Sequence, residues 1–122
     1  MKMIIDISEG QKENNNLVRF QLFELGRDFM LWISGGDSHI GALTCSDKNR
    51  NADTWQHTLI HHKEDVLVTR AMKKLKDGLP GELLVVAGVH YDDIDKEKIK
   101  EIVKHATYLL DVMVKEIACK VR

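Results

Sequence analysis

The chain has 122 residues, which suffices for one domain over residues 1–122 with a single two-layer core. Its 18 Lys and Arg nearly balance its 19 Asp and Glu, so the formal net charge of −1 argues against nucleic acid or an acidic surface as a partner. Hydrophobic residues make up 43% of the chain, as in ordinary soluble globular proteins, and no apolar run approaches the roughly 20 residues that span a membrane.

The first ten residues, MKMIIDISEG, contain one lysine and too short an apolar stretch for a signal peptide. We therefore expect a cytoplasmic protein. In that compartment Cys45 and Cys119 should be reduced, buried thiols rather than a disulfide.

The first half of the chain resembles a series of strands. Residues 3–7 and 17–25 alternate apolar and polar side chains, which is typical of half-buried strands. Residues 29–33 and 40–45 are apolar runs on either side of a glycine-rich turn, and residues 54–60 alternate again. Consecutive strands with short connections predict an antiparallel meander.

The second half changes period. Residues 68–75 follow helical spacing, and Gly78 with Pro80 just beyond it marks the end of that helix. Residues 82–89 are almost continuously apolar, which predicts a central strand covered on both faces. Asp95 is a suitable N-cap for a long amphipathic helix. The order βββββ-α-β-α predicts an α+β fold with one mostly antiparallel sheet and two helices.

Three polar clusters lie where predicted strands end, at residues 35–41, 61–64 and 88–93. The glycines of the first cluster allow a positive φ or close approach of the backbone to a ligand. Its polar residues supply an acceptor, a hydroxyl and an imidazole: Asp37, Ser38 and His39. Because strand ends can gather at one rim of a sheet, we expect His39, Lys63 and His90 to lie together there.

The second cluster precedes a helix, whose free N–H groups and partial positive charge favour an anion. Lys63, His62 and Arg70 would make a phosphate-binding corner, with Lys63 near the phosphate. Gly35 and Gly36 could add a nest of backbone N–H groups.

Each cluster also has a structural explanation. The glycine-rich loop could be a hairpin turn, and the later polar residues could cap the two helices. We assign His57 and His105 to structure. Five histidine and carboxylate residues could also bind zinc or iron: His39, His62, His90, Glu64 and Asp93. No two of these three histidines show HxH or HxxxH spacing. No nucleophile–base pair or catalytic motif is recognisable, so we expect neither catalytic nor metal-binding residues.

Three motifs recur in this order in one small family. They are Gly35-Gly36-Asp37-Ser38-His39-Ile40-Gly41-Ala42, then His62-Lys63-Glu64-Asp65, then Ala87-Gly88-Val89-His90 followed by Asp93-Ile94. On these motifs the chain resembles the prenylated-flavin chaperone-like family, the small D subunit found with gallate- and protocatechuate-type decarboxylases. Ser38 stands where that family's pattern has proline, and His61 where it has glycine. The family's fold is similar to that of proteasome assembly chaperones.

The resemblance implies a non-catalytic, homodimeric binding protein. It would hold prenylated flavin mononucleotide (prenylated FMN, or FMN) and help to mature the catalytic subunit of a prenylated-flavin-dependent aromatic acid decarboxylase. The residues that the resemblance and the cluster chemistry assign to cofactor binding are Gly35, Gly36, Asp37, His39, Gly41, His62, Lys63, Glu64, Arg70, His90 and Asp93. Two alternatives stay open: a dimeric assembly chaperone without a small ligand, and a small metal-dependent enzyme.

Overall fold

The computed structural model describes residues 1–10, 17–50, 52–58 and 64–121. Its strands and α-helices follow the predicted βββββ-α-β-α order and confirm the α+β class. In chain order they are β1 (Lys2–Ile7), β2 (Arg19–Leu25), β3 (Asp28–Gly36), β4 (Ala42–Asp47), β5 (Ala52–Thr58), α1 (Asp65–Leu75), β6 (Leu83–His90) and α2 (Lys96–Lys120). Short 3₁₀ turns follow β4 (Lys48–Arg50) and α1 (Lys76–Gly78).

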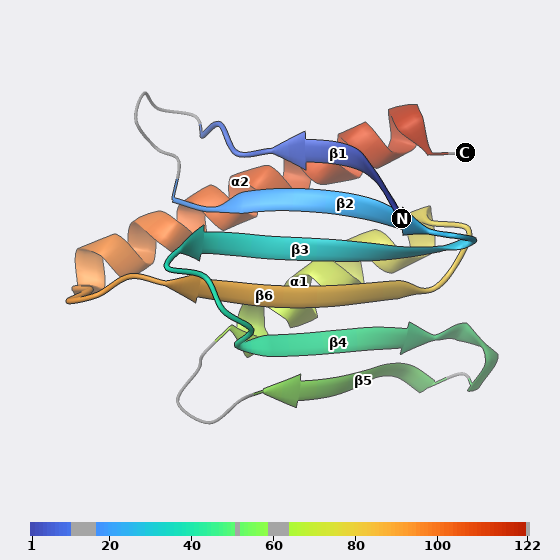
Figure 1. The fold of residues 1–122 in the computed structure, drawn as a ribbon, viewed down its shortest axis with the longest axis horizontal. Coiled ribbons are helices and arrows are strands. Elements are labelled where there is room, and N and C mark those ends of the chain that lie inside the picture. The colour runs from blue at the N-terminus through green and yellow to red at the C-terminus, as the bar shows by residue number, and fades with distance from the viewer. Residues whose placement is uncertain (11–16, 51, 59–63, 122) are drawn as a thin grey trace.

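The six strands form one sheet in the order β1-β2-β3-β6-β4-β5. All neighbouring pairs are antiparallel except β3 and β6, which run parallel (Figure 1). The sheet is therefore mostly antiparallel, as predicted, but the five-strand meander is wrong. The chain meanders through β1, β2 and β3, and β6 then returns after α1 to lie between β3 and β4.

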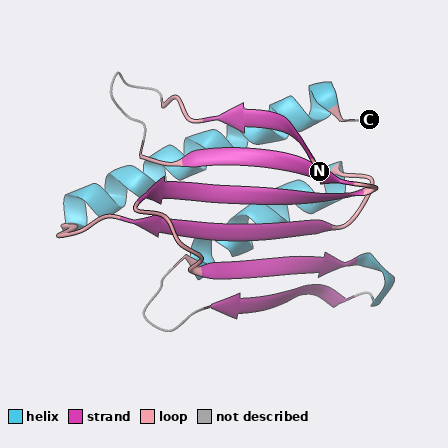
Figure 2. Cartoon of the chain, in the orientation of Figure 1, coloured by secondary structure: helices cyan, strands magenta, loops and turns pink. Residues whose placement is uncertain are grey.

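Both helices cover one face of the sheet, so the molecule has two layers (Figure 2). Strand residues that point to the helices are fully buried, for example Leu31, Ile33 and Val85. Residues that alternate with them, such as Trp32, Leu84 and Val86, are only half-buried. The central position of β6 is confirmed, but its coverage on both faces is wrong, because no described element covers the second face.

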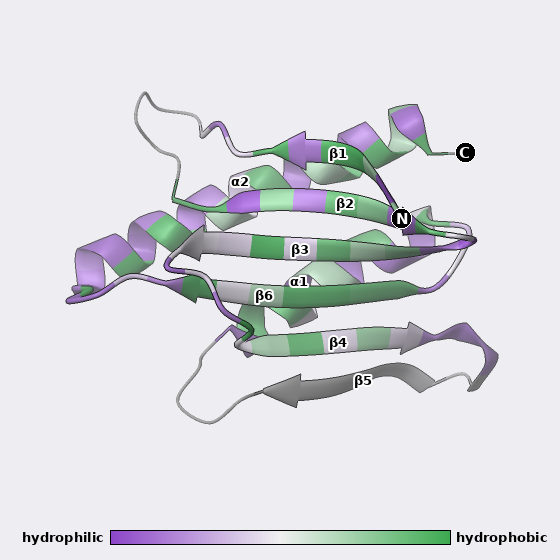
Figure 3. Cartoon of the chain, in the orientation of Figure 1, coloured by the Kyte–Doolittle hydropathy of each residue, from purple (hydrophilic) through white to green (hydrophobic). Residues whose placement is uncertain are grey.

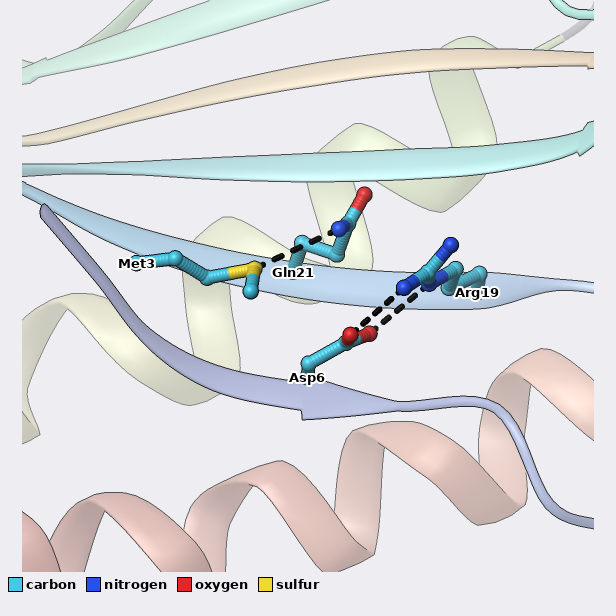
Figure 4. Close-up of polar contacts among 4 residues, drawn as sticks. All are labelled: Met3, Asp6, Arg19 and Gln21. Atoms are coloured by element: carbon cyan, nitrogen blue, oxygen red, sulfur yellow. Dashed lines mark hydrogen bonds and ion pairs between the residues drawn. The ribbon is translucent and has the colours of Figure 1, made fainter.

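We call this second face the open face. Its half-buried apolar side chains come from the four inner strands, among which β6 is hydrophobic over most of its length (Figure 3). They are Phe23, Met30, Trp32, Leu43, Leu84 and Val86. Towards β1 the same face becomes polar: Arg19 makes two hydrogen bonds to Asp6, at 2.5 and 2.8 Å, and Gln21 lies 3.3 Å from the Met3 sulfur (Figure 4). The paired guanidinium lowers the pKa of Asp6.

The start of β6 is held between β3 and β4 by side-chain hydrogen bonds. The Ser46 hydroxyl donates to Glu82 Oε1 at 2.6 Å and accepts from the Leu83 N–H at 2.9 Å. The Glu82 N–H donates to Asp28 Oδ1, at the start of β3. These contacts join β3, β6 and β4 at the end opposite the predicted site.

Helix α2 begins as predicted, with the Asp95 side chain accepting the Lys98 N–H at 2.8 Å. His105, 1% exposed, lies on its buried face and accepts the N–H groups of Leu17 and Val18 through Nδ1, each at 3.1 Å. This arrangement agrees with a structural role for His105 and ties α2 to the start of β2. Among the described residues, no helix is both long and apolar enough to cross a membrane.

The two cysteines lie far apart in the sequence. Cys45 is half-buried in β4, where burial is the main cause that raises its pKa. Cys119 is exposed, contrary to the prediction that it is buried, because it lies in the last turn of α2 on the side away from Ile117 and the core.

Candidate functional site

The candidate site lies where β3 and β6 end side by side. Because β6 is inserted between β3 and β4, the connection from β3 to β4 must cross β6, and it does so on the open face (Figure 1). We call residues 37–41 the crossing segment. It passes over Gly88, where any Cβ would overlap the carbonyl oxygen of His39. A glycine at this position is therefore a requirement of the topology.

Backbone hydrogen bonds attach the crossing segment to β6 at both ends. The Asp37 N–H donates to the His90 carbonyl at 2.9 Å, and the Gly41 N–H donates to the Ala87 carbonyl at 2.8 Å. At the first end Gly36 has a φ of 63°, a conformation that glycine adopts without strain. The segment is thus held across the strand rather than hanging free.

The glycine amides predicted to form an anion nest are engaged within the fold. The Gly35 N–H donates to the Ser38 hydroxyl at 2.8 Å, and that hydroxyl donates to the Gly35 carbonyl at 3.0 Å. The Ser38 N–H turns back to the Gly36 carbonyl at 3.0 Å. This geometry favours side chains over glycine amides as ligand contacts in the first cluster.

The crossing segment brings two predicted site residues together. The rings of His39 and His90 are 5.3 Å apart between centroids, in an edge-to-face arrangement with an angle of 67°. His90 Nε2 lies 3.1 Å from Asp92 Oδ1, and His39 Nδ1 lies 3.3 Å from the Asp37 carbonyl oxygen. His39 is exposed and the His90 side chain is 43% exposed, so both imidazoles lie at the surface of the protein.

Glu64 and Gly41 meet at the place where β4 separates from β6. Glu64 is only 7% exposed, and its Oε1 accepts the Val89 N–H at 3.3 Å. Gly41 packs so closely on this carboxylate that a Cβ would overlap it. The Glu64 carboxylate therefore accepts a β6 N–H in the place of a neighbouring strand. This contact gives Glu64 and Gly41 a structural role.

The other predicted residues have different surroundings. Arg70 is exposed on α1, and Asp93 is exposed in the turn before α2, with a φ of 51°. Asp95, not His90 or Asp93, caps α2. His62 and Lys63 lie outside the described residues, as does the rest of the 59–63 segment. Within the described ranges, no three His, Cys, Asp or Glu residues are grouped so that they could hold a metal ion.

The charge around the histidine pair is negative. Asp37 precedes His39 by two residues, Asp92 contacts His90, and Asp93 follows in the same turn. The Asp92 carboxylate, 3.1 Å from His90 Nε2, disfavours an anionic group beside that imidazole.

Two aromatic residues near the site were missed at the sequence level. The tip of the Trp32 indole (Cη2) lies 3.1 Å from the position that a Gly88 Cβ would occupy, so the ring ends against the crossing segment. Tyr91 donates its hydroxyl to the Leu17 carbonyl at 2.5 Å, and Lys98 Nζ lies 4.9 Å from its ring centre. Burial is the main cause that raises the pKa of Tyr91. Because side chains alternate between the two faces of any strand, Trp32 had to lie opposite Leu31 and Ile33, and this could have indicated its position.

Comparison with known structures supports the observed fold. The chain is similar to one from a structure described as a novel chaperone complex for yeast 20S proteasome assembly, with a TM-score of 0.51 over 96% of this chain and 99% of that chain. The two share 10% sequence identity, so the likeness concerns the fold alone. Among curated proteins no significant match was found.

A family model gives the more specific result. The model described as the prenylated flavin chaperone LpdD-like domain matches residues 12–118, which include all three polar motifs and both histidines of the pair. This match covers most of the sequence and agrees with the resemblance noted from the motifs. The chain belongs to the prenylated flavin chaperone LpdD-like family.

Proposed function

We propose that this protein binds reduced prenylated FMN beside His39 and His90 and passes it to the catalytic subunit of an aromatic acid decarboxylase, without catalysing a reaction itself. The observation that carries the proposal is the exposed histidine pair, which the crossing segment holds over the ends of the two central strands. The family description supports the type of ligand.

The chemistry of the site suits such a ligand. A flavin ring system carries carbonyl and nitrogen acceptors along one edge, and imidazole N–H groups can donate to them. The apolar side chains of the open face, such as Val86, suit a flat, poorly hydrated ring. In the decarboxylase the prenylated flavin would supply the reactive centre, whereas here the protein would only bind, orient and shield it.

We further propose that the protein is a homodimer in which two copies meet through the open face around Phe23, Met30 and Leu84, leaving the end beside the crossing segment to the ligand. Six strands spaced by about 4.8 Å and about 20 Å long give a face of roughly 600 Å². This approaches the roughly 800 Å² per partner of a standard interface. Its half-buried Phe23, Met30 and Leu84 are the kind of residues that an interface core contains.

The direct test is to co-express the protein with a flavin prenyltransferase, purify it without oxygen, and record its absorption and mass spectra. We expect prenylated FMN to copurify, and the loaded protein to activate a decarboxylase catalytic subunit that lacks cofactor. The protein alone should convert aromatic acids no faster than a mock preparation. A loaded protein that activates no catalytic subunit would remove the delivery part of the proposal.

The contribution of the second cluster can be tested with Lys63→Ala. Loss of a charge-assisted contact should cost about 1.5–3 kcal/mol, or about ten- to a hundredfold in affinity for a phosphorylated flavin. Lys104→Ala, on the exposed side of α2, is the matched control and should bind as the wild type does. Equal affinities for the two variants would refute the assignment of Lys63.

The open face also favours a second candidate, an assembly chaperone that binds a partner subunit and no small molecule. That function predicts a purified protein without a chromophore that still promotes assembly of the partner. Copurification of stoichiometric flavin would exclude it.

A further inference from the structure

Trp32 lies in the middle of the open face, on the strand that leads into the candidate site. It is in register with Gln21 on β2 and Val86 on β6. Its neighbours Leu31 and Ile33 point to the helices and are completely buried, whereas Trp32 points away from them and is half-buried. The indole therefore takes no part in the core between the sheet and the helices.

The indole is directed along the sheet towards the histidine pair. Its Cη2 atom lies 3.1 Å from the position that a Gly88 Cβ would occupy, and the carbonyl group of His39 overlaps that same position. Alternation along β6 places Val86, Gly88 and His90 on one face. The tip of the Trp32 indole and the main chain of His39 thus meet over Gly88, and the His39 ring pairs with the ring of His90 two residues further along β6.

We infer that Trp32 is the stacking surface for the tricyclic ring of the flavin, with the two imidazoles at the edge of that ring; this inference rests on the proposed function. Stacking on an indole gains contact over a whole planar ring, and a tryptophan with only two side-chain torsions loses little entropy when it is covered. The adjoining Val86 extends the apolar floor.

The charges give the ligand a direction. The Asp92 carboxylate beside the His90 imidazole opposes a phosphate at this end, so the ring end of the ligand lies over Trp32 and the phosphate points away. A flavin without phosphate should therefore still bind through Trp32. Riboflavin is a suitable probe because it has the same parent ring system and no charge.

The first experiment is an oxygen-free titration of wild type and variants with reduced prenylated FMN and with reduced riboflavin. Trp32→Leu should weaken both ligands by about tenfold or more, the size found for stacking of a base on an aromatic side chain. Trp32→Phe should retain most of the affinity. Met30→Leu, a volume-conserving change two residues earlier on the same face, is the control and should change little.

The second experiment leaves Trp32 in place. The chain has two tryptophans, so Trp55→Phe makes Trp32 the sole tryptophan. Flavin binding should then quench the remaining tryptophan fluorescence saturably, with the same dissociation constant as the titration. This readout does not depend on whether Trp32→Leu folds, which circular dichroism would establish separately.

The outcomes separate the inference from the proposed function. If the wild type binds flavin but Trp32→Leu binds it equally well, or if the Trp32 fluorescence does not respond, the inference is wrong and the proposed function stands. If Trp32→Leu binds normally but becomes monomeric, Trp32 belongs to the interface between copies and the inference is again wrong. If the wild type binds neither flavin, the proposed function fails and the inference fails with it.

Discussion

At the scale of single residues, Gly88 determines whether the crossing segment can pass over β6. In Gly88→Ala the new methyl group would overlap the His39 carbonyl oxygen, which is backbone and cannot rotate away. We expect a loss of about 3 kcal/mol in the free energy of unfolding, together with loss of flavin binding as His39 shifts from His90. Urea denaturation and ligand titration would measure the two effects.

Gly78→Ala is the matched control. A Cβ there would meet only Ile117 Cγ2, at an ordinary contact distance of 3.8 Å, and Gly78 has no positive φ. Its stability should change by less than about 1 kcal/mol. Equal stability losses in the two variants would mean that the overlap at Gly88 is relieved without cost.

A second residue-scale prediction concerns His105 and pH. Desolvation by burial lowers the pKa of His105, and the nearby Ser8 backbone opposes this only in part. The folded state therefore keeps Nδ1 unprotonated, as an acceptor for the Leu17 and Val18 N–H groups. The unfolded state takes up a proton below about pH 6.5, so the stabilising effect of neutral His105 is present above that pH and is lost as the pH falls below it.

We expect the free energy of unfolding to fall with a slope of up to about 1.4 kcal/mol per pH unit below about pH 6.5. Urea denaturation of the wild type and of His105→Gln over this range would measure it. The variant should be less stable near neutral pH but should lack this part of the slope. An unchanged slope in the variant would assign the pH dependence to other groups.

At the scale of elements, the sequence predicted the type and order of the strands and helices, because alternation, helical spacing and Gly78-Pro80 are local signals. It did not predict where β6 enters the sheet, because strand order depends on contacts between distant residues. The same limit applies to the site. His39 and His90 were predicted from their strand ends, but the roles of Gly88 and Trp32 appear only once the β3–β4 connection is known to cross β6.

The contribution of the hydrogen bonds that hold β6 beside β4 can be tested through Ser46. Its hydroxyl accepts the Leu83 N–H and donates to Glu82, and it is 5% exposed. Ser46→Ala should leave the buried Leu83 N–H without this acceptor and lower the free energy of unfolding by about 1–3 kcal/mol. Thr107→Ala removes a hydroxyl from the exposed side of α2, where it donates to the Val103 carbonyl, and should cost less than about 0.5 kcal/mol. Chemical denaturation of both variants would decide.

At the scale of the whole molecule, the open face predicts the oligomeric state. The wild type should scatter light as a species of twice 14.0 kDa at tens of micromolar. Leu84→Glu places a charge in the centre of the open face without touching the core between sheet and helices, and should yield a folded monomer. A monomeric wild type, or a variant that remains dimeric, would show that copies do not associate through this face.

The position of β6 also has a consequence for how the chain folds. Without β6, the described sheet would fall into two parts, β1–β2–β3 and β4–β5. β6 joins these two parts, although it leaves the ribosome after all five of those strands. At their first contacts the partners are far apart in sequence: Asp28 and Glu82 are separated by 54 residues. Until β6 arrives, β3 and β4 both present edges with unpaired backbone groups, which are prone to pair with other chains. A member of a chaperone family thus has a vulnerable stage in its own synthesis, which ends only when β6 enters the sheet.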